Sequence, residues 1–76
     1  MKPIKRSLTI AGHRTSISLE PPFWVALQLV ADFEETTVAA LVARIDAERT
    51  AADDADNGGL SGAVRVHILL HFTHMK

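Results

Sequence analysis

The stretch that decides the fold is residues 14–20, which read RTSISLE. Apolar and polar side chains alternate along it, which is the pattern of a β-strand with one buried face. Ile17 and Leu19 would point to the buried side, because side chains two apart share one face of a strand. The opposite face would carry the polar side chains Arg14, Ser16 and Ser18.

The residues just before this strand show the same alternation. Residues 8–10 read LTI, and Gly12 separates them from the strand. Glycine is a typical break in a strand pattern, so the two runs form either one interrupted strand or a hairpin. A strand that stands alone leaves its N–H and C=O groups unpaired and is therefore expected to pair with a second chain.

Two helices are predicted after the strand. Pro21 and Pro22 end the strand, and proline is favoured in the first turn of a helix. An apolar stripe with helical spacing then predicts a first helix over residues 21–35. Thr37 is a good N-cap residue, and it predicts a second helix over residues 37–52.

An acidic, glycine-containing linker over residues 53–59 separates these helices from a third apolar segment, residues 60–73. The alternation of its first half fits a buried strand. The adjacent Leu69 and Leu70 break that alternation, so a helix is favoured, with Ser61 as its candidate N-cap. We therefore predict one domain over residues 1–76, with a β-ribbon and basic arm over residues 1–20.

Composition narrows the class of protein. The chain has 76 residues and no cysteine, and 47% of it is hydrophobic. A chain this short forms one domain with a marginal core, and oligomerisation is the remaining means of stabilising it once disulfides are excluded. The net charge is -1, yet all four basic residues up to Arg14 precede the first acid, Glu20. This separation of charge along the chain indicates either a basic binding surface near the N-terminus or a solvated basic tail.

The longer run over residues 5–21, KRSLTIAGHRTSISLEP, resembles a compact bacterial ribbon-helix-helix family of the MetJ/Arc/CopG class. The resemblance continues into the first helix at Phe23 and Trp24, and it covers nearly the whole chain. It implies a mainly α fold with a short N-terminal β-ribbon, an extra C-terminal helix and an intertwined homodimer.

The resemblance also implies a function: a dimeric, sequence-specific DNA-binding protein, a transcriptional regulator that reads the major groove with an antiparallel β-ribbon. The residues expected to contact bases are Arg14, Ser16 and Ser18. Those expected to contact phosphates are Lys5, Arg6, His13, Thr37 and Val38. Those expected in the shared dimer core are Ile17, Leu19, Trp24, Leu27, Leu41 and Ile45.

The sequence departs from the family in three places. Glu35 stands where the family commonly ends its first helix with glycine, which predicts a reshaped or strained turn. Ala39 replaces a small hydroxyl residue early in the second helix. The C-terminal residues 71–76 lack the basic ending expected of the family. The last two departures weaken the expected DNA affinity more than they affect the fold.

No catalytic pair, nucleotide loop or metal-ligand motif is recognisable, so we predict neither an enzyme nor a cofactor. His67 and His71 have a spacing that can hold zinc, but we interpret them as polar-edge residues of an apolar helix. Neither a signal peptide nor a membrane span is predicted, and a cytoplasmic location is expected. Two alternatives stay open: an antitoxin, and an interaction module on the same dimer fold with a protein partner bound through residues 60–72.

Overall fold

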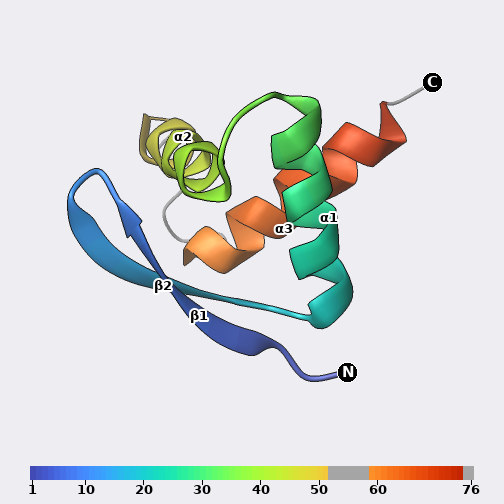
Figure 1. Cartoon of the computed structure of the whole chain (residues 1–76), viewed down its shortest axis with the longest axis horizontal. Helices are drawn as coiled ribbons and strands as arrows, with labels where there is room; N and C mark the ends of the chain where they lie inside the picture. Colours follow the sequence, from blue (N-terminus) through green and yellow to red (C-terminus); the bar gives the residue numbers. More distant parts are fainter. Residues whose placement is uncertain (52–58, 75–76) are drawn as a thin grey trace.

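In the computed structural model, which describes residues 1–51 and 59–74, an N-terminal β-hairpin is followed by helices (Figure 1). The elements are β1 (Ile4–Ile10), β2 (His13–Leu19), α1 (Pro21–Phe33), α2 (Val38–Ala51) and α3 (Gly59–Thr73). The predicted short N-terminal ribbon, the two helices after it and the extra C-terminal helix are confirmed. The predicted linker over residues 53–59 lies, except for Gly59, outside the described residues.

The hairpin settles one of the alternatives that the sequence left open. β1 pairs antiparallel with β2, and Ile10 and His13 flank the two-residue turn of Ala11 and Gly12. Both turn residues have positive φ, at 51° and 78°. Positive φ at both positions is typical of the type I′ turn, whose twist matches that of the two strands. The hairpin alternative is therefore confirmed, and the expectation of a strand without a partner in its own chain is wrong, because β1 pairs with β2.

The core lies between the inner face of the hairpin and the three helices. Ile17 and Leu19 of β2 are 1% and 0% exposed, so the buried face of this strand is the one expected from its alternation. The buried hydrophobic residues from the helices are Trp24, Leu27, Val30, Ala31, Leu41, Val42, Ile45, Val64 and Ile68. Because α3 contributes two of them, it is part of the domain core and not an appendage.

The end of α1 has the strained geometry that its sequence predicts. Glu35 adopts a left-handed conformation with φ of 56°, and the N–H of Thr36 donates to the C=O of Ala31 at 2.9 Å. This is the hydrogen bond of a Schellman motif, in which glycine is the usual left-handed residue. A residue with a Cβ in this conformation costs roughly 1 kcal/mol or more. The turn therefore keeps the Schellman geometry at the expense of strain.

The starts of α2 and α3 differ from each other. The Thr37 side chain accepts a hydrogen bond from the N–H of Ala40 at 3.1 Å, which confirms the predicted N-cap. The prediction that Ser61 caps α3 was wrong, because α3 begins at Gly59 and Ser61 lies inside it. The Ser61 hydroxyl instead accepts a hydrogen bond from β2. The predicted helix for this segment, in place of a buried strand, is confirmed.

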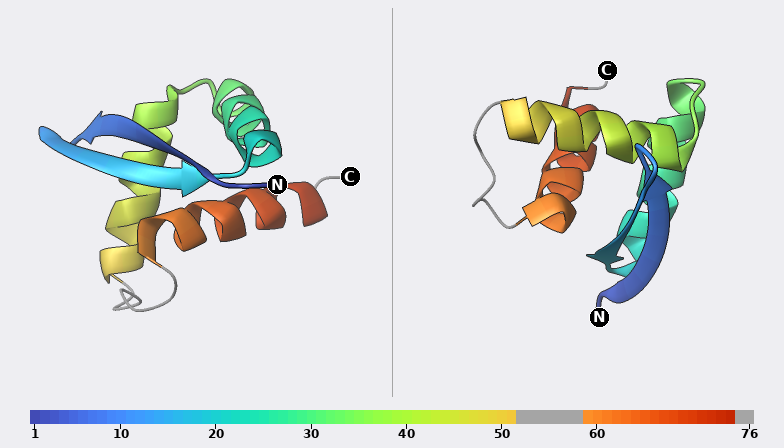
Figure 2. Two further views of the ribbon diagram at one scale, coloured as in Figure 1. Left: turned by 90° about the horizontal axis from the view of Figure 1, so that it is seen from below. Right: turned by 90° about the vertical axis from the view of Figure 1, so that its left-hand side faces the viewer.

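Two further views show how the hairpin sits on the helices (Figure 2). The hairpin covers one side of the helical part, and its turn projects past α2 in both Figure 1 and the left view of Figure 2. Within the described residues, no helix has the length and apolar character needed to cross a membrane.

Candidate nucleic-acid interface

The face of the hairpin that points away from the helices is entirely polar. The strand register places Lys5 opposite Ser18, Ser7 opposite Ser16, and Thr9 opposite Arg14. Residues directly opposite each other in an antiparallel pair project to the same face. We call the resulting surface the outward face; it consists of Lys5, Ser7, Thr9, Arg14, Ser16 and Ser18.

The outward face carries positive charge without any acid to neutralise it. Lys5 and Arg14 lie at opposite ends of it and on different strands. Within the described ranges neither side chain has an ion-pair partner, and both residues are exposed. Between them lie hydroxyl side chains, which can donate or accept hydrogen bonds. A two-stranded ribbon of this kind has the width to enter the major groove of B-DNA.

The open end of the hairpin is fixed to α1 through its inner face. The guanidinium of Arg6 lies 4.8 Å from the ring centre of Trp24, which is a cation–π contact. The indole N–H of Trp24 donates to the C=O of Ile4 at 3.5 Å. Arg6 was grouped with Lys5 as an expected phosphate contact, but the register places it on the opposite face of the hairpin. It therefore does not join Lys5 and Arg14.

The free edge of β2 is partly covered by α3. The N–H of Ser18 donates to the Ser61 hydroxyl at 2.9 Å, and the guanidinium of Arg65 donates to the Ser18 C=O at 2.9 Å. Arg65 also forms an ion pair with Glu20 at 2.9 Å. Hydrogen bonding to the Glu20 backbone, and then to Arg65, holds the pKa of the Glu20 carboxyl below its ordinary value. These contacts join the end of β2 to α3.

The other expected phosphate contacts lie on separate elements. His13 is exposed next to the hairpin turn, on the same face as Ile10. Thr37 and Val38 lie at the start of α2, where the Thr37 side chain caps the helix. The first N–H groups of a helix favour anions, so the start of α2 is still suited to bind a phosphate. It is not part of the outward face.

The six residues expected in a shared dimer core are all buried within the single chain: Ile17, Leu19, Trp24, Leu27, Leu41 and Ile45. Their burial follows from contacts between the hairpin and the helices of one copy. Among the described residues, most of the large apolar side chains that remain exposed lie on α1 and α3, and the others are Met1 and Ile4 near the N-terminus.

Sequence reasoning missed Ser7 and Thr9 as members of the outward face. It assigned the polar surface to β2 alone and treated β1 as part of a basic arm. The signal that could have found them is the two-residue turn, because a two-residue hairpin loop fixes the strand register. Pairing Ile10 with His13 places Thr9 beside Arg14 and Ser7 beside Ser16.

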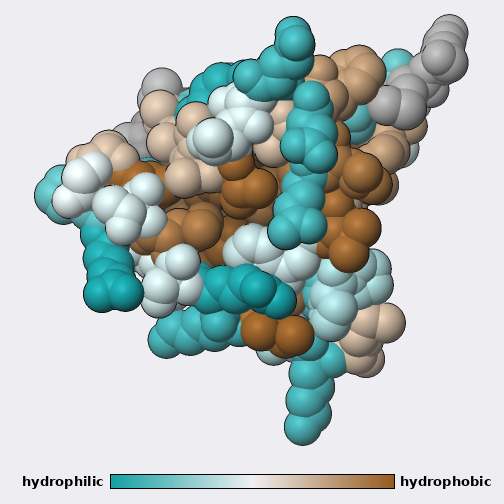
Figure 3. Space-filling view, in the orientation of Figure 1, coloured by the Kyte–Doolittle hydropathy of each residue, from teal (hydrophilic) through white to brown (hydrophobic). Residues whose placement is uncertain are grey.

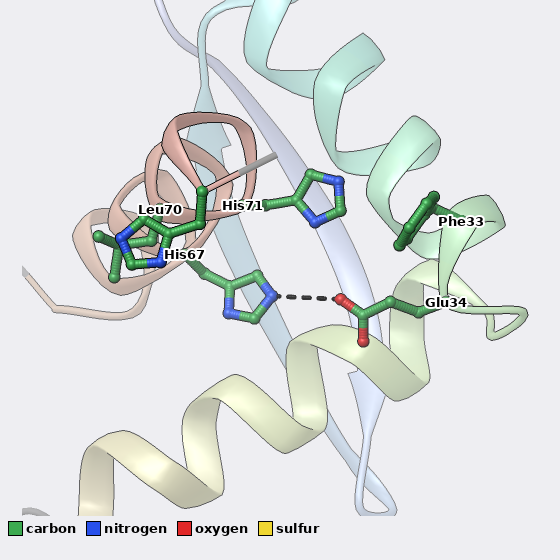
Figure 4. Close-up of a pocket in the computed structure, with 6 residues that line it drawn as sticks. Phe33, Glu34, His67, Leu70 and His71 are labelled. Carbon is green, nitrogen blue, oxygen red and sulfur yellow. Dashed lines mark ion pairs between the residues drawn. The ribbon is translucent and has the colours of Figure 1, made fainter. Parts of the chain in front are cut away.

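The three histidines near the C-terminal end meet the end of α1 in a hollow of about 480 Å³ (Figure 4). His67 lies 3.5 Å from the carboxylate of Glu34, and the ring of His71 packs edge-on against Phe33. In the described part of the chain no group of three histidine, cysteine or acidic side chains is placed to hold a metal ion. His67 and His71 both contact residues at the end of α1.

The chain was also compared with known proteins. A family model described as the ribbon-helix-helix domain matches residues 3–72, which is most of the chain. No curated protein and no solved structure matches it.

Proposed function

The chain belongs to the ribbon-helix-helix family, and we propose from this premise that it is a sequence-specific DNA-binding protein that reads the major groove with its β1–β2 hairpin. The family has a non-enzymatic DNA-binding fold and commonly serves in transcription regulators and antitoxins. We propose further that this chain is a cytoplasmic bacterial transcription regulator that acts as a homodimer.

The observation that carries this proposal is the composition of the outward face. It presents two cationic side chains, which have no ion-pair partner among residues 1–51 and 59–74, and otherwise only hydroxyl groups, with no acid among its six residues. Phosphates are attracted by the cations whatever the base sequence, whereas base edges are distinguished by directed hydrogen bonds. Arg14 can bond both guanine acceptors at once, and the hydroxyls of Ser7, Thr9 and Ser16 can meet either donors or acceptors.

We assign distinct roles to the predicted contacts. Arg14, Ser16 and Ser18 read bases from β2, and Ser7 and Thr9 add readers from β1. Lys5 supplies sequence-independent attraction from the outward face. Arg6 and His13 lie on the inner face of the hairpin and add only long-range attraction to phosphates. Thr37 and Val38 add a phosphate contact at the start of α2 if the DNA backbone reaches that helix.

The test is selection from random duplex DNA at low salt, followed by binding measurements on the selected sequence. Arg14→Ala should weaken binding by about 1–3 kcal/mol and relax the base preference at one position. Lys5→Ala should weaken binding to all sequences alike and reduce the salt dependence. Arg44→Ala removes an exposed cation outside the hairpin and should leave the affinity unchanged. Recovery of random sequences, with equal affinities for all three variants, would contradict the proposal.

An antitoxin is the second candidate, and the exposed apolar side chains of α3 favour it. Leu69 and Leu70 are more than half exposed in the single chain. Large exposed apolar patches mark interaction sites, and an antitoxin needs such a site for its toxin. The same exposed side chains also support the third candidate, an interaction module that does not bind DNA. Both alternatives predict a heterologous protein complex that involves residues 60–72, and the module also predicts no DNA selection.

A further inference from the structure

The contacts between α3 and the hairpin converge on one residue of the outward face, Ser18. Its N–H donates to the Ser61 hydroxyl at 2.9 Å, and its C=O accepts a hydrogen bond from the Arg65 guanidinium at 2.9 Å. Ser61 and Arg65 are four residues apart, so they lie on the same side of α3. The helix therefore satisfies both backbone groups of this one strand residue.

Arg65 is itself held in place by the junction between β2 and α1. Its Nε donates to the carboxylate of Glu20, the N-cap residue of α1, at 3.0 Å. Its guanidinium also lies 5.8 Å from the ring centre of Phe23, which is within range of a cation–π contact. A planar guanidinium can bond a carbonyl and a carboxylate at the same time in a fixed geometry. One side chain of α3 thus joins the last residues of β2 to the start of α1.

The packing of the hairpin alone does not fix the direction of Ser18. The surface of the hairpin is mostly hydrophilic in the view of Figure 3, and Ser18 lies on the outward face opposite Lys5. Burial of the neighbouring Ile17 and Leu19 holds the strand against the helices, but hydrophobic contact is not directional. Hydrogen bonds are directional, so the contacts from Ser61 and Arg65 fix the peptide groups of Ser18.

From these contacts we propose that Ser61 and Arg65 are positioning residues, which act on base discrimination through the backbone of Ser18 and not through contact with DNA. The inference rests on the proposed DNA-binding function and deepens it, because it gives α3 a part in that function. Base edges are distinguished by hydrogen bonds of defined geometry, whereas phosphates attract cations whatever the sequence. A loosened end of β2 would therefore lose discrimination and keep its general attraction for DNA.

The first test is amide hydrogen exchange of the full chain, followed by NMR without DNA. Ser61→Ala removes the acceptor of the Ser18 N–H, and alanine is the better helix former, so α3 itself should not be weakened. We expect the Ser18 amide to exchange about tenfold faster. The amide of Ser16, two residues earlier on the same strand, should keep its rate. An unchanged rate at Ser18 would overturn the proposal, and so would equal acceleration at both amides.

The second test compares the affinity for the selected duplex with that for an unrelated duplex at one salt concentration. Arg65→Lys keeps the charge but loses the planar group that bonds Ser18 and Glu20 together. This variant and Ser61→Ala should each bind the selected duplex about fivefold more weakly and the unrelated duplex like the wild type. Arg44→Ala is the matched control, because it breaks an ion pair with Glu34 away from the hairpin and should change neither affinity.

A merely structural role of Ser61 and Arg65 would lower both affinities by the same factor, and that result would overturn the proposal. Unchanged affinity for the selected duplex in both variants would overturn it as well. A wild-type chain that selects no sequence would contradict the proposed function and the role in discrimination with it. The exchange rate of Ser18 would then still decide whether α3 holds the end of β2.

Discussion

The outward face of the hairpin differs in chemistry from a second surface, formed by exposed apolar side chains of α1 and α3. We call this second surface the apolar face; its members are Val25, Leu29, Phe33, Val66, Leu69 and Leu70. The outward face is formed by short polar side chains between Lys5 and Arg14, and water hydrates all of them. The apolar face leaves large hydrocarbon side chains such as Phe33 and Leu69 in contact with water. The net charge of -1 is a sum over the whole chain, so it does not describe either surface. The outward face carries the positive charge that suits a polyanion, whereas the side chains of the apolar face carry none.

The largest expected effect separates the two faces of a single strand. Ile17→Asp would place a charge at a site that is 1% exposed, and we expect a loss of more than roughly 4 kcal/mol, enough to unfold the chain. Ser16→Asp, one residue away on the outward face, should fold normally and lose DNA binding through repulsion of phosphates. Circular dichroism and DNA titration check both changes. A folded Ile17→Asp variant would show that the strand faces are assigned the wrong way round.

The next prediction tests whether β1 takes part in reading the bases. Thr9 lies beside Arg14 on the outward face, so Thr9→Val keeps the shape of the side chain but removes its hydroxyl. We expect a loss of about 1 kcal/mol in affinity for the selected DNA and unchanged affinity for unrelated DNA. Fluorescence anisotropy at fixed salt measures both values. Equal losses for both DNAs would mean that Thr9 does not read bases.

A stabilising change should leave both faces as they are. Glu35→Gly relieves the left-handed strain at the end of α1 and should raise the free energy of unfolding by about 1 kcal/mol. Urea unfolding measures this value. Because Glu35 belongs to neither face, DNA affinity and the dimer dissociation constant should not change. A change in either one would mean that the turn controls a binding surface.

The smallest expected effect concerns pH. Hydrogen bonding from Arg44, and then from His67, holds the pKa of Glu34 below its ordinary 4.5. A lowered folded-state pKa gives stability that is present above the unfolded pKa and is lost as pH falls through the folded value. Urea unfolding should therefore show that Glu34→Gln reduces the loss of stability between about pH 5 and pH 3. The matched control is Glu48→Gln, an exposed residue on α2, and a similar reduction in that variant would contradict the assignment to Glu34.

Much of this fold could be predicted from local pattern. The alternation of residues 14–20 identified the buried face of β2, and Thr37 marked the start of α2. The position of Ser61 could not be predicted, because its hydroxyl bonds to Ser18, a residue 43 positions away in the sequence. A contact of this kind depends on how α3 packs against the hairpin and leaves no local signal.

Of the candidate base-reading residues, only those of β2 could be predicted from the sequence, because those of β1 depend on how the two strands pair. Arg14, Ser16 and Ser18 follow from strand periodicity alone. Ser7 and Thr9 require the strand register, which depends on whether Ala11 and Gly12 form a turn. Alanine disfavours the positive φ that this turn needs, so the local sequence signal for the hairpin is weak. The separation of Arg6 from Lys5 follows from the same register.

The most direct test of the central claim is an NMR titration of the ¹⁵N-labelled chain with the selected duplex DNA. We expect the amide shifts to change in the hairpin, at Lys5, Ser7, Thr9, Arg14 and Ser16. The amides of the apolar face should keep their positions, because the proposed DNA contacts lie on the hairpin. Shift changes centred on α1 and α3, with none in the hairpin, would contradict the proposed DNA interface.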